Sequence, residues 1–335
     1  MKREVEAIAL LISIIFLAVG SPALAADKLT FNLNYWYVGD HSPYFVALEK
    51  GWYKEEGLDP NILTGKGSGD VVKRVDVGSA DIGIVDAGVA IVARAQGAKV
   101  KVISMLFDKS PYCMWFWKDS GINSPKDLIG KKVAAQPGDA QRTIFPALAA
   151  ANGFDPDKVT FVNIAAEAKF TTLASKAADV VFDYYTGAPF FQKAMGKENV
   201  KYMMFADWGV DVYSNSLVTT EKYLKENPSI VKRFVKASLR GWEYTLKNPE
   251  EAINILAKHR PEIDKQLLLA NLRLVIDLFR TNRYKQHGIG WVDDKKMADS
   301  IKIISQYRDL KVDMITSDMY TNEFLTYYPL SVEVK

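Results

Sequence analysis

Short apolar runs alternate with amphipathic stretches of helical period along most of the chain. The runs that predict strands end in polar or turn residues, and they cover residues 61–63, 80–85, 100–107, 132–136, 159–164, 179–183 and 200–205. The stretches between them predict helices. Strands that alternate with helices in this way favour parallel sheets in an α/β fold.

Two runs interrupt this alternation and predict crossings between two lobes. The first, DKSPYCMWFWK at residues 108–118, joins two strand-like runs through Ser110 and Pro111, and residues 212–219 form the return. A second α/β series is enclosed between the crossings. We therefore expect two α/β lobes joined by two crossing strands, with a ligand cleft between them that closes by hinge motion. The expected lobes are residues 26–111 with 214–335, and residues 112–213.

Residues 34–57 predict a buried strand, a short polar loop, one compact helix and a turn. Ser42 is expected to be the helix N-cap, with Pro43 at the first helical position and Gly51 in a left-handed C-cap. In open α/β sheets, ligands bind outside the carboxyl ends of the strands. Asp40 and His41 lie at such a place, so both are candidate ligand-binding residues.

Two turns open helices that could face the same cleft. GKGSGD at residues 65–70 leads into a helix ending near Gly78, and it lacks the GxxxxGK[ST] pattern of a nucleotide P-loop. Either an anion site or a flexible turn fits this stretch, and Ser68 is a candidate contact. Gly138 and Asp139 form the second turn, whose helix N-terminus would serve an anionic group.

The chain after the return crossing is predicted to be mostly helical. Helices are expected from Pro228, from Pro249 through Lys258, and over residues 263–279 and 297–307. The third of these is rich in leucine, which indicates packing.

The N-terminal segment has the pattern of a cleaved secretory signal. Lys2 and Arg3 precede an apolar run over residues 7–20, and Ala23 and Ala25 give the small-x-small pattern of a cleavage site. A membrane anchor is the alternative, but the run is shorter than the ~20 apolar residues that a spanning helix needs. We therefore expect residues 1–25 to be removed and the protein to be periplasmic.

The composition limits the remaining classes of function. The 335 residues are 48% hydrophobic and 25% charged, and the net charge of +3 is too small to argue for nucleic acid or an anionic membrane. Cys113 is the sole cysteine and the three histidines are far apart in sequence, which disfavours a metal site. We expect a monomer with no metal, no cofactor, no nucleic acid partner and no membrane anchor.

Carboxylates recur at or just after the predicted strand ends. They could accept hydrogen bonds from the amine or amide nitrogens of a ligand, and their alternative role is helix capping. The five candidates are Asp40, Asp86, Asp108, Asp139 and Asp183.

Aromatic residues gather at the strand ends and crossings, where a planar ligand could stack between rings. Strand alternation lets only about half of an adjacent set face one side, so Tyr35 and Tyr37 share a face that excludes Trp36. Asp183 and Tyr185 likewise share a face that excludes Tyr184. The aromatic candidates are Tyr35, Trp36, Tyr37, Tyr112, Trp115, Tyr184 and Tyr185.

A set of motifs in order along the chain resembles the NMT1/THI5-like group of periplasmic solute-binding proteins. The motifs are Asn34-Tyr35, His41-x-Pro43, Ala47, KGWYKEEGL at residues 50–58, Gly78-x-Ala80-Asp81-Ile82-Gly83, Ile129-Gly130-Lys131-Lys132, Tyr223-Leu224-Lys225-Glu226-Asn227-Pro228 and Tyr320-Thr321-Asn322-Glu323. The resemblance implies a type II periplasmic binding protein fold. It also implies a small-molecule ligand, and as partners the membrane permease of an ABC transporter with its separate ATPase subunit.

The same family includes a thiamine pyrimidine synthase that uses its own lysine and histidine. By our alignment those positions are Val85 and Val89 here, and the synthase's cysteine-rich run, which would fall near residues 209–215, is absent. We therefore expect a binding protein and no enzyme, although a pyrimidine-synthase-like enzyme stays an alternative, as does a sensor input for a membrane kinase.

The resemblance also bears on the ligand. Binding proteins for thiamine pyrimidine precursors carry an acidic residue at the position of Tyr185, and Asp183, on the same predicted strand face, could replace it. A planar nitrogen heterocycle similar to pyrimidine is the expected ligand. Nitrate, sulfonate, riboflavin and aromatic-acid binders share the broad pattern and remain alternatives.

Overall fold

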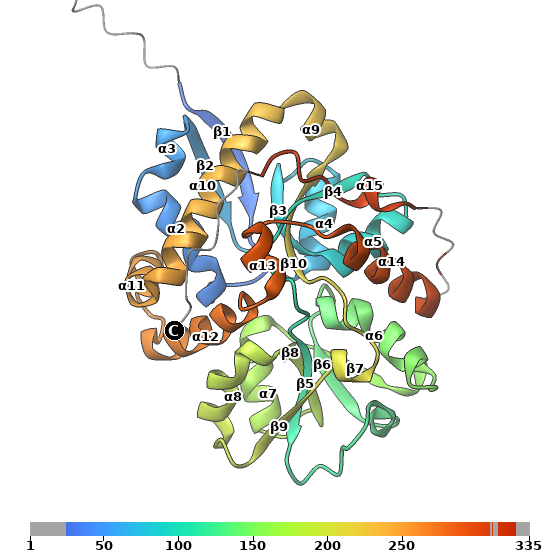
Figure 1. Ribbon diagram of the computed structural model, residues 1–335. Helices are drawn as coiled ribbons and strands as arrows, with labels where there is room; N and C mark the ends of the chain where they lie inside the picture. Colours follow the sequence, from blue (N-terminus) through green and yellow to red (C-terminus); the bar gives the residue numbers. More distant parts are fainter. Residues whose placement is uncertain (1–24, 309, 311–313, 326–335) are drawn as a thin grey trace, which may run out of the picture.

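The computed structural model describes residues 25–308, 310 and 314–325 as two lobes, each built on a five-stranded sheet (Figure 1). The predicted signal peptide, except Ala25, lies outside these described residues. Within them, no helix is long and apolar enough to cross a membrane.

The first sheet mixes parallel and antiparallel strands. β10 runs antiparallel to both of its neighbours, whereas β1 is parallel to β2 and β3. The strand order is β2 (Leu58–Leu63), β1 (Asp27–Asn32), β3 (Ile82–Asp86), β10 (Asn215–Thr220) and β4 (Val100–Met105).

The second sheet has the same plan, with β5 antiparallel to β8 and β9. Its order is β7 (Thr160–Asn163), β6 (Lys132–Ala135), β8 (Val180–Tyr184), β5 (Tyr112–Trp117) and β9 (Val200–Met204). The expectation of parallel sheets is therefore wrong for one strand in each. β5 and β10 are the strands that arrive directly from the other lobe, so each enters its sheet in the reverse direction.

Helices cover both faces of the first sheet (Figure 1). One group is η1 (Gly39–His41), α2 (Ser42–Glu49), α3 (Trp52–Glu55), α10 (Pro228–Lys247), α11 (Pro249–His259), α12 (Lys265–Leu278) and α13 (Asn282–His287); the other is α4 (Ser68–Asp76), α5 (Ala87–Ala95), α14 (Asp294–Arg308) and α15 (Thr316–Met319). α9 (Glu221–Glu226) follows β10. The second lobe carries α6 (Ala140–Ala151), α7 (Lys169–Ala174) and α8 (Ala188–Met195), with short turns η2 (Pro125–Leu128), η3 (Pro156–Lys158), η4 (Ala166–Ala168), η5 (Tyr185–Gly187) and η6 (Ala206–Trp208).

The lobes pack directly against each other, so the structure is a closed one. One continuous apolar core includes residues of α4, α5 and α14 from the first lobe and α6 from the second. At its centre Gly88 lies against the side chains of Ile144 and Ile304. A second core lies between the first sheet and α2, α10, α11 and α12.

The stretch after β1 differs from its prediction. β1 ends at Asn32, and residues 34–38 are irregular, so the alternation expected for Tyr35 and Tyr37 does not apply. Ser42 is the first residue of α2 and His41 takes the N-cap position, so the predicted cap is wrong; the Ser42 hydroxyl donates to the carbonyl of Gly39 at 2.7 Å. The left-handed conformation predicted for Gly51 is confirmed, with φ of 75°.

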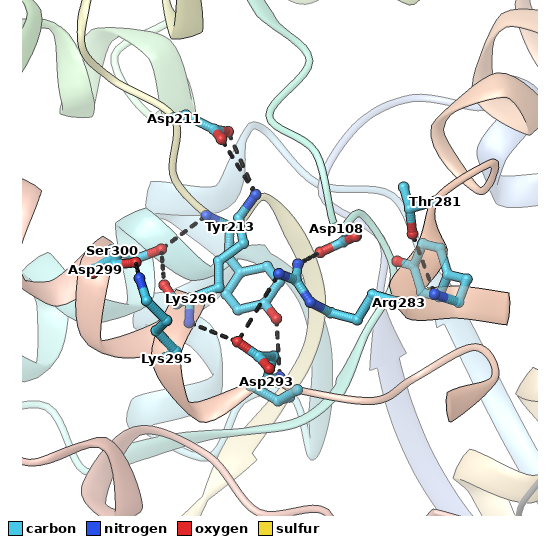
Figure 2. A network of polar contacts seen from close by, with 12 residues as sticks. Asp108, Asp211, Tyr213, Thr281, Arg283, Asp293, Lys295, Lys296, Asp299 and Ser300 are labelled. Atoms are coloured by element: carbon cyan, nitrogen blue, oxygen red, sulfur yellow. Dashed lines mark hydrogen bonds and ion pairs between the residues drawn. The ribbon is translucent and has the colours of Figure 1, made fainter. Parts of the chain in front are cut away.

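Both crossings between the lobes are held by one polar network from α13 and α14 (Figure 2). Arg283 donates to Asp108 of the first crossing, and its guanidinium lies 5.9 Å from the ring centre of Tyr213 in the second. The Tyr213 oxygen accepts from the backbone N–H of Asp293 at 3.0 Å, and the Tyr213 N–H donates to Ser300 at 3.1 Å. We call this set of contacts the hinge network, because it ties both crossings, where the hinge is expected, to α13 and α14.

Candidate functional site

A small cavity of about 70 Å³ lies between the two lobes. Ligand sites for drug-sized molecules occupy about 300–1,000 Å³, so a ligand needs the lobes to separate in order to enter. Both lobes contribute to the wall, which consists of Asn34, Tyr35, Val38, Asp40, Gly67, Ser68, Asp86, Gln136, Asp139, Ala140, Gln141, Lys169, Phe170, Asp183, Tyr184, Thr186, Gly187, Phe190 and Asn271.

Asp86, at the end of β3, accepts hydrogen bonds from four hydroxyls. Ser68 and Ser214 donate from the first lobe. Tyr112 and Tyr184 donate from the second lobe, at 2.6 and 2.7 Å. Burial raises the pKa of Asp86, while the four donors stabilise its carboxylate. Asp86 therefore links the two lobes, and its carboxylate oxygens already accept hydrogen bonds from within the protein.

Lys169 forms the second buried charge cluster, together with two aspartates. Its side chain is 2% exposed, and Nζ lies 2.7 Å from Asp139 Oδ2 and 3.7 Å from Asp183 Oδ1. These two anions outweigh burial and raise the pKa of Lys169 above its usual range. Asp139 also caps α6 by accepting from the N–H of Gln141 at 3.1 Å, so this helix N-terminus already holds a carboxylate of the chain itself.

Asp40 faces the cavity from a chain of amide contacts. Asn215 donates to Asp40 at 3.3 Å and accepts from Asn34 at 2.8 Å, and Asn34 in turn is 3.0 Å from Nε2 of His41. Burial raises the pKa of Asp40 to about 6 and lowers that of His41 to about 3. His41 is therefore neutral near pH 7 and supports Asn34 from behind the wall.

Aromatic rings form the apolar part of the wall. Phe170 and Phe190 stack on each other with ring centres 5.0 Å apart and planes at 14°. Tyr35 reaches across the cleft and donates to the carbonyl of Ala166 at 3.1 Å. A flat ligand in the cavity would contact these aromatic rings and also the charged side chains of the wall described above.

Of the residues nominated from the sequence, seven line this cavity: Tyr35, Asp40, Ser68, Asp86, Asp139, Asp183 and Tyr184. The prediction that Asp183 and Tyr184 face opposite sides of the strand, so that only one could line the cavity, is wrong. β8 ends at Tyr184 and the backbone turns into η5, so strict alternation is lost at that point.

Three nominated aromatic residues lie near the cavity but outside its wall. Trp36 packs beside Phe190, and Arg260 lies over its ring at 4.9 Å and over Tyr37 at 5.9 Å. The hydroxyl of Tyr185 donates to a backbone carbonyl of α12 at 3.3 Å. Arg260 and α12 of the first lobe thus contact these rings, and Trp36 also contacts Phe190 of the second lobe.

Trp115 is directed away from the cavity by strand alternation in β5. It stacks on Phe191 with ring centres 4.6 Å apart, on the outer face of the sheet. Cys113 shares that face, is fully buried, and donates its thiol to the carbonyl of Asp183 at 3.3 Å. Tyr112, on the opposite face, contacts Asp86 behind the cavity wall.

The last two nominated residues have structural partners elsewhere. Asp108 pairs with Arg283 in the hinge network. Gly138 accepts from the N–H of Gly69 at 3.0 Å across the lobes and faces a separate, open groove of about 960 Å³.

Sequence reasoning missed several polar residues of the wall. Asn271 interrupts a leucine-rich helix that we assigned to packing, and this interruption was the available signal. Gln141 follows the Gly138-Asp139 turn, where a first-turn side chain can face a ligand. Lys169 had no local signal, because its partner Asp139 lies 30 residues earlier.

Comparison with known proteins adds a family and several relatives. The family model described as NMT1/THI5 like matches residues 38–252. The 4-amino-5-hydroxymethyl-2-methylpyrimidine phosphate synthase of Legionella pneumophila is 28% identical over 312 residues, covering 91% of this chain and 94% of the relative. The formylaminopyrimidine-binding protein of Halalkalibacterium halodurans is 25% identical, with 79% and 82% covered. The riboflavin-binding protein RibY of Chloroflexus aurantiacus is 26% identical, with 89% and 86% covered.

Solved structures with the same fold include periplasmic binding proteins. The aliphatic sulphonate binding protein SsuA from Escherichia coli matches with a TM-score of 0.65 and 14% identity, covering 89% of this chain and 99% of that one. The nitrate-binding protein NrtA from Synechocystis PCC 6803 matches with a TM-score of 0.64 and 13% identity, covering 89% and 87%. The predicted fold class is therefore confirmed.

The expectation that this chain is not an enzyme is contradicted by its relatives. The synthase of Legionella pneumophila and that of Candida albicans, which is 26% identical over 322 residues, are both named as enzymes and match along most of the chain. Absence of the expected lysine and histidine at Val85 and Val89 was too narrow a basis for that prediction.

Proposed function

The chain belongs to the NMT1/THI5-like family, and we propose that it captures a small, planar, nitrogen-containing heterocycle in the cavity between its lobes. In this proposal the lobes close about the crossings near Ser110 and Ser214, which separate residues 26–111 and 214–335 from residues 112–213. The periplasmic protein then delivers the ligand to the permease of an ABC importer.

The acidic character of the cavity carries the proposal. Its described wall includes the carboxylates of four aspartates and the ammonium of Lys169. Asp86 is satisfied by hydroxyls and Asp139 is paired with Lys169, which leaves Asp40 and Asp183 with the most acceptor capacity for a ligand. A ligand rich in N–H donors with an aromatic ring satisfies both these carboxylates and the rings of Phe170 and Phe190.

Anionic ligands fit this wall less well. The N-terminus of α6, which would attract a carboxylate, sulfonate or nitrate, is capped by Asp139. The cation of Lys169 is shared between two aspartates. An acid entering the cavity would therefore meet excess negative charge without a free positive partner in the described wall.

Two relatives support a heterocycle. One is named as a formylaminopyrimidine-binding protein and another as a riboflavin-binding protein, and both names describe nitrogen heterocycles. The family context thus agrees with the donor-rich ligand that the carboxylates favour.

A thermal-shift screen of residues 26–335 tests the proposal, with aminopyrimidines, flavins, aromatic acids, sulfonates and nitrate as probes. A ligand at 100 times its Kd adds about 2.7 kcal/mol of stability, which is visible as a higher Tm. Shifts with aminopyrimidines or flavins are the expected result. Shifts with sulfonates, nitrate or carboxylates alone would contradict it.

The transport role has its own test. A strain that lacks the gene should lose uptake of the radiolabelled ligand found in the screen, and a copy of the gene should restore it. Tight binding with unchanged uptake in the deletion strain would contradict delivery to an importer.

Pyrimidine synthesis is a second candidate, favoured by the synthases that align along most of the chain. The test uses residues 26–335 expressed in the cytoplasm of a strain that requires 4-amino-5-hydroxymethyl-2-methylpyrimidine. Growth without that supplement would support synthesis, and growth only with it would favour binding alone.

A further inference from the structure

The cavity wall contains a buried polar group that the protein leaves without a partner. Gln141 lies in the first turn of α6, lines the cavity, and is 2% exposed. Its amide nitrogen Nε2 has no hydrogen-bond partner among the described residues. Leaving a buried amide without a partner is energetically unfavourable, so such a group in a cavity wall points to a ligand atom.

The other side-chain amides of the wall are satisfied within the protein. Gln136, oriented to fulfil both ends of its amide, donates to the carbonyl of Lys66 and accepts from the N–H of Ala166, each at 3.0 Å. Asn271 accepts from the N–H of Gly39 at 2.8 Å and donates to the carbonyl of Thr186 at 2.7 Å. Gln141 therefore differs from the other amide side chains of the wall, because they have hydrogen-bond partners within the protein.

Asp40 lies in the same wall and can accept hydrogen bonds from a ligand. Asp40 projects from the first lobe and receives one long side-chain hydrogen bond, from Asn215 at 3.3 Å. Gln141 projects from the second lobe and offers a donor. A ligand that contacts both residues must then present N–H groups to Asp40 and a lone pair to Gln141.

We propose that Gln141 is a specificity-determining residue that donates its amide N–H to an acceptor atom of the ligand. The ligand class is an amino-substituted heterocycle whose N–C–NH₂ edge places a ring-nitrogen acceptor beside an amine donor. This inference rests on the proposed binding function and narrows it, because a plain amine or a carbocyclic aniline fills the carboxylate half of the wall and leaves Gln141 unpaired.

Two probes of similar shape isolate the ring nitrogen. 4-Aminopyrimidine has the acceptor and aniline lacks it, and calorimetry measures the affinity of each for residues 26–335. Wild-type protein should prefer 4-aminopyrimidine by about tenfold, the order expected for one buried hydrogen bond and the penalty of leaving its donor unpaired. Gln141→Met, which keeps the length of the side chain without its donor, should reduce this preference to about twofold or less.

Gln136→Met is the matched control from the same wall. Gln136 bonds to protein atoms of both lobes, so its loss should weaken binding of both probes by the same factor and preserve the preference. Gln141→Leu gives a second test of the donor, because leucine has no polar hydrogen to donate. Thermal melts of each variant show whether it is folded.

The outcomes distinguish an incorrect role for Gln141 from an incorrect binding function. Folded Gln141 variants that keep the wild-type preference overturn the role of Gln141 while leaving the binding function intact. Wild-type protein that binds both probes equally overturns the ligand class. Wild-type protein that binds neither these probes nor any heterocycle of the screen overturns the binding function, and this inference with it.

Discussion

Asp40 and His41 are adjacent buried residues whose pKa values shift in opposite directions. The pKa of Asp40 rises from its usual 3.8 to about 6 in the folded protein, and that of His41 falls from 6.5 to about 3. The folded state therefore favours the proton on Asp40, which lowers stability as pH rises from about 4 to 6. His41 favours the deprotonated form, which lowers stability as pH falls from about 6.5 to 3.

Asp40→Asn should remove one of these two slopes. Relative to wild type, the variant should gain on the order of 2–3 kcal/mol of stability between pH 4 and pH 7, because the neutral amide avoids the buried charge. Urea unfolding at pH 4, 5, 6 and 7 measures the difference. His41→Gln should give the opposite trend, with its gain over wild type growing as pH falls. A constant difference between Asp40→Asn and wild type across this range would contradict the assignment.

A second prediction at the residue scale concerns the contribution of Lys169 to stability. Lys169→Met should destabilise the fold by about 3–5 kcal/mol, because it leaves Asp139 and Asp183 buried without their cation. Adding Asp139→Asn should recover part of the loss, since asparagine keeps the cap on α6. Chemical denaturation measures both variants. Lys193→Met, which breaks the exposed pair with Asp264, is the control and should cost less than about 1 kcal/mol.

The contact between α2 and α10 depends on a missing side chain. A Cβ atom on Gly241 would lie 2.2 Å from the carbonyl oxygen of Pro43 and 3.2 Å from Cβ of Ala47. Alanine is the better helix former by about 1 kcal/mol, but the backbone of α2 cannot move away without disturbing the core. The close approach of the two helices should therefore outweigh helix propensity.

Gly241→Ala should destabilise the protein by about 2 kcal/mol, a usual cost of overpacking. Urea unfolding provides the measurement. Gly88→Ala in α5 is the matched control. Its nearest neighbours are the ends of two isoleucine side chains at 3.1 and 3.3 Å, which can shift, so the loss should be smaller. A Gly241 variant as stable as wild type would show that α2 can move to accommodate the added methyl group.

The sequence predicted elements whose signal is local and missed those that depend on distant partners. The runs that became β3 and β8 were visible as apolar stretches, residues 212–219 as the return crossing that contains most of β10, and Gly51 as a helix terminator. The stretch after β1 was misassigned because its aromatic residues are also common in strands. At the site, Asp86 could be nominated from its strand end, but its four hydroxyl partners come from residues 68, 112, 184 and 214.

At the scale of the whole molecule, Arg283 connects the two crossings. Arg283→Ala should loosen both segments, so the ligand-free protein should show a larger radius of gyration in small-angle X-ray scattering. The apparent affinity for ligand should fall about fivefold, because a smaller fraction of molecules is closed. Added ligand should restore the compact form.

Arg273→Ala is the control for that experiment. Arg273 of α12 pairs with Glu250 of α11, both side chains are exposed, and neither residue belongs to a crossing. It should leave both scattering and affinity unchanged. Equal behaviour of the two variants would show that the hinge network has no influence on closure.

The burial of Cys113 makes this protein convenient as an optical reporter. It is the sole cysteine of the chain, it is fully buried in β5, and burial raises the pKa of its thiol well above the usual value. Labelling requires the thiolate to attack the electrophilic dye, so the native chain should remain unlabelled. Cysteines introduced at exposed Val77 and Ile129, one on each lobe, would then accept a fluorophore pair without removal of any native residue. Energy transfer between the dyes would follow opening and closing in real time.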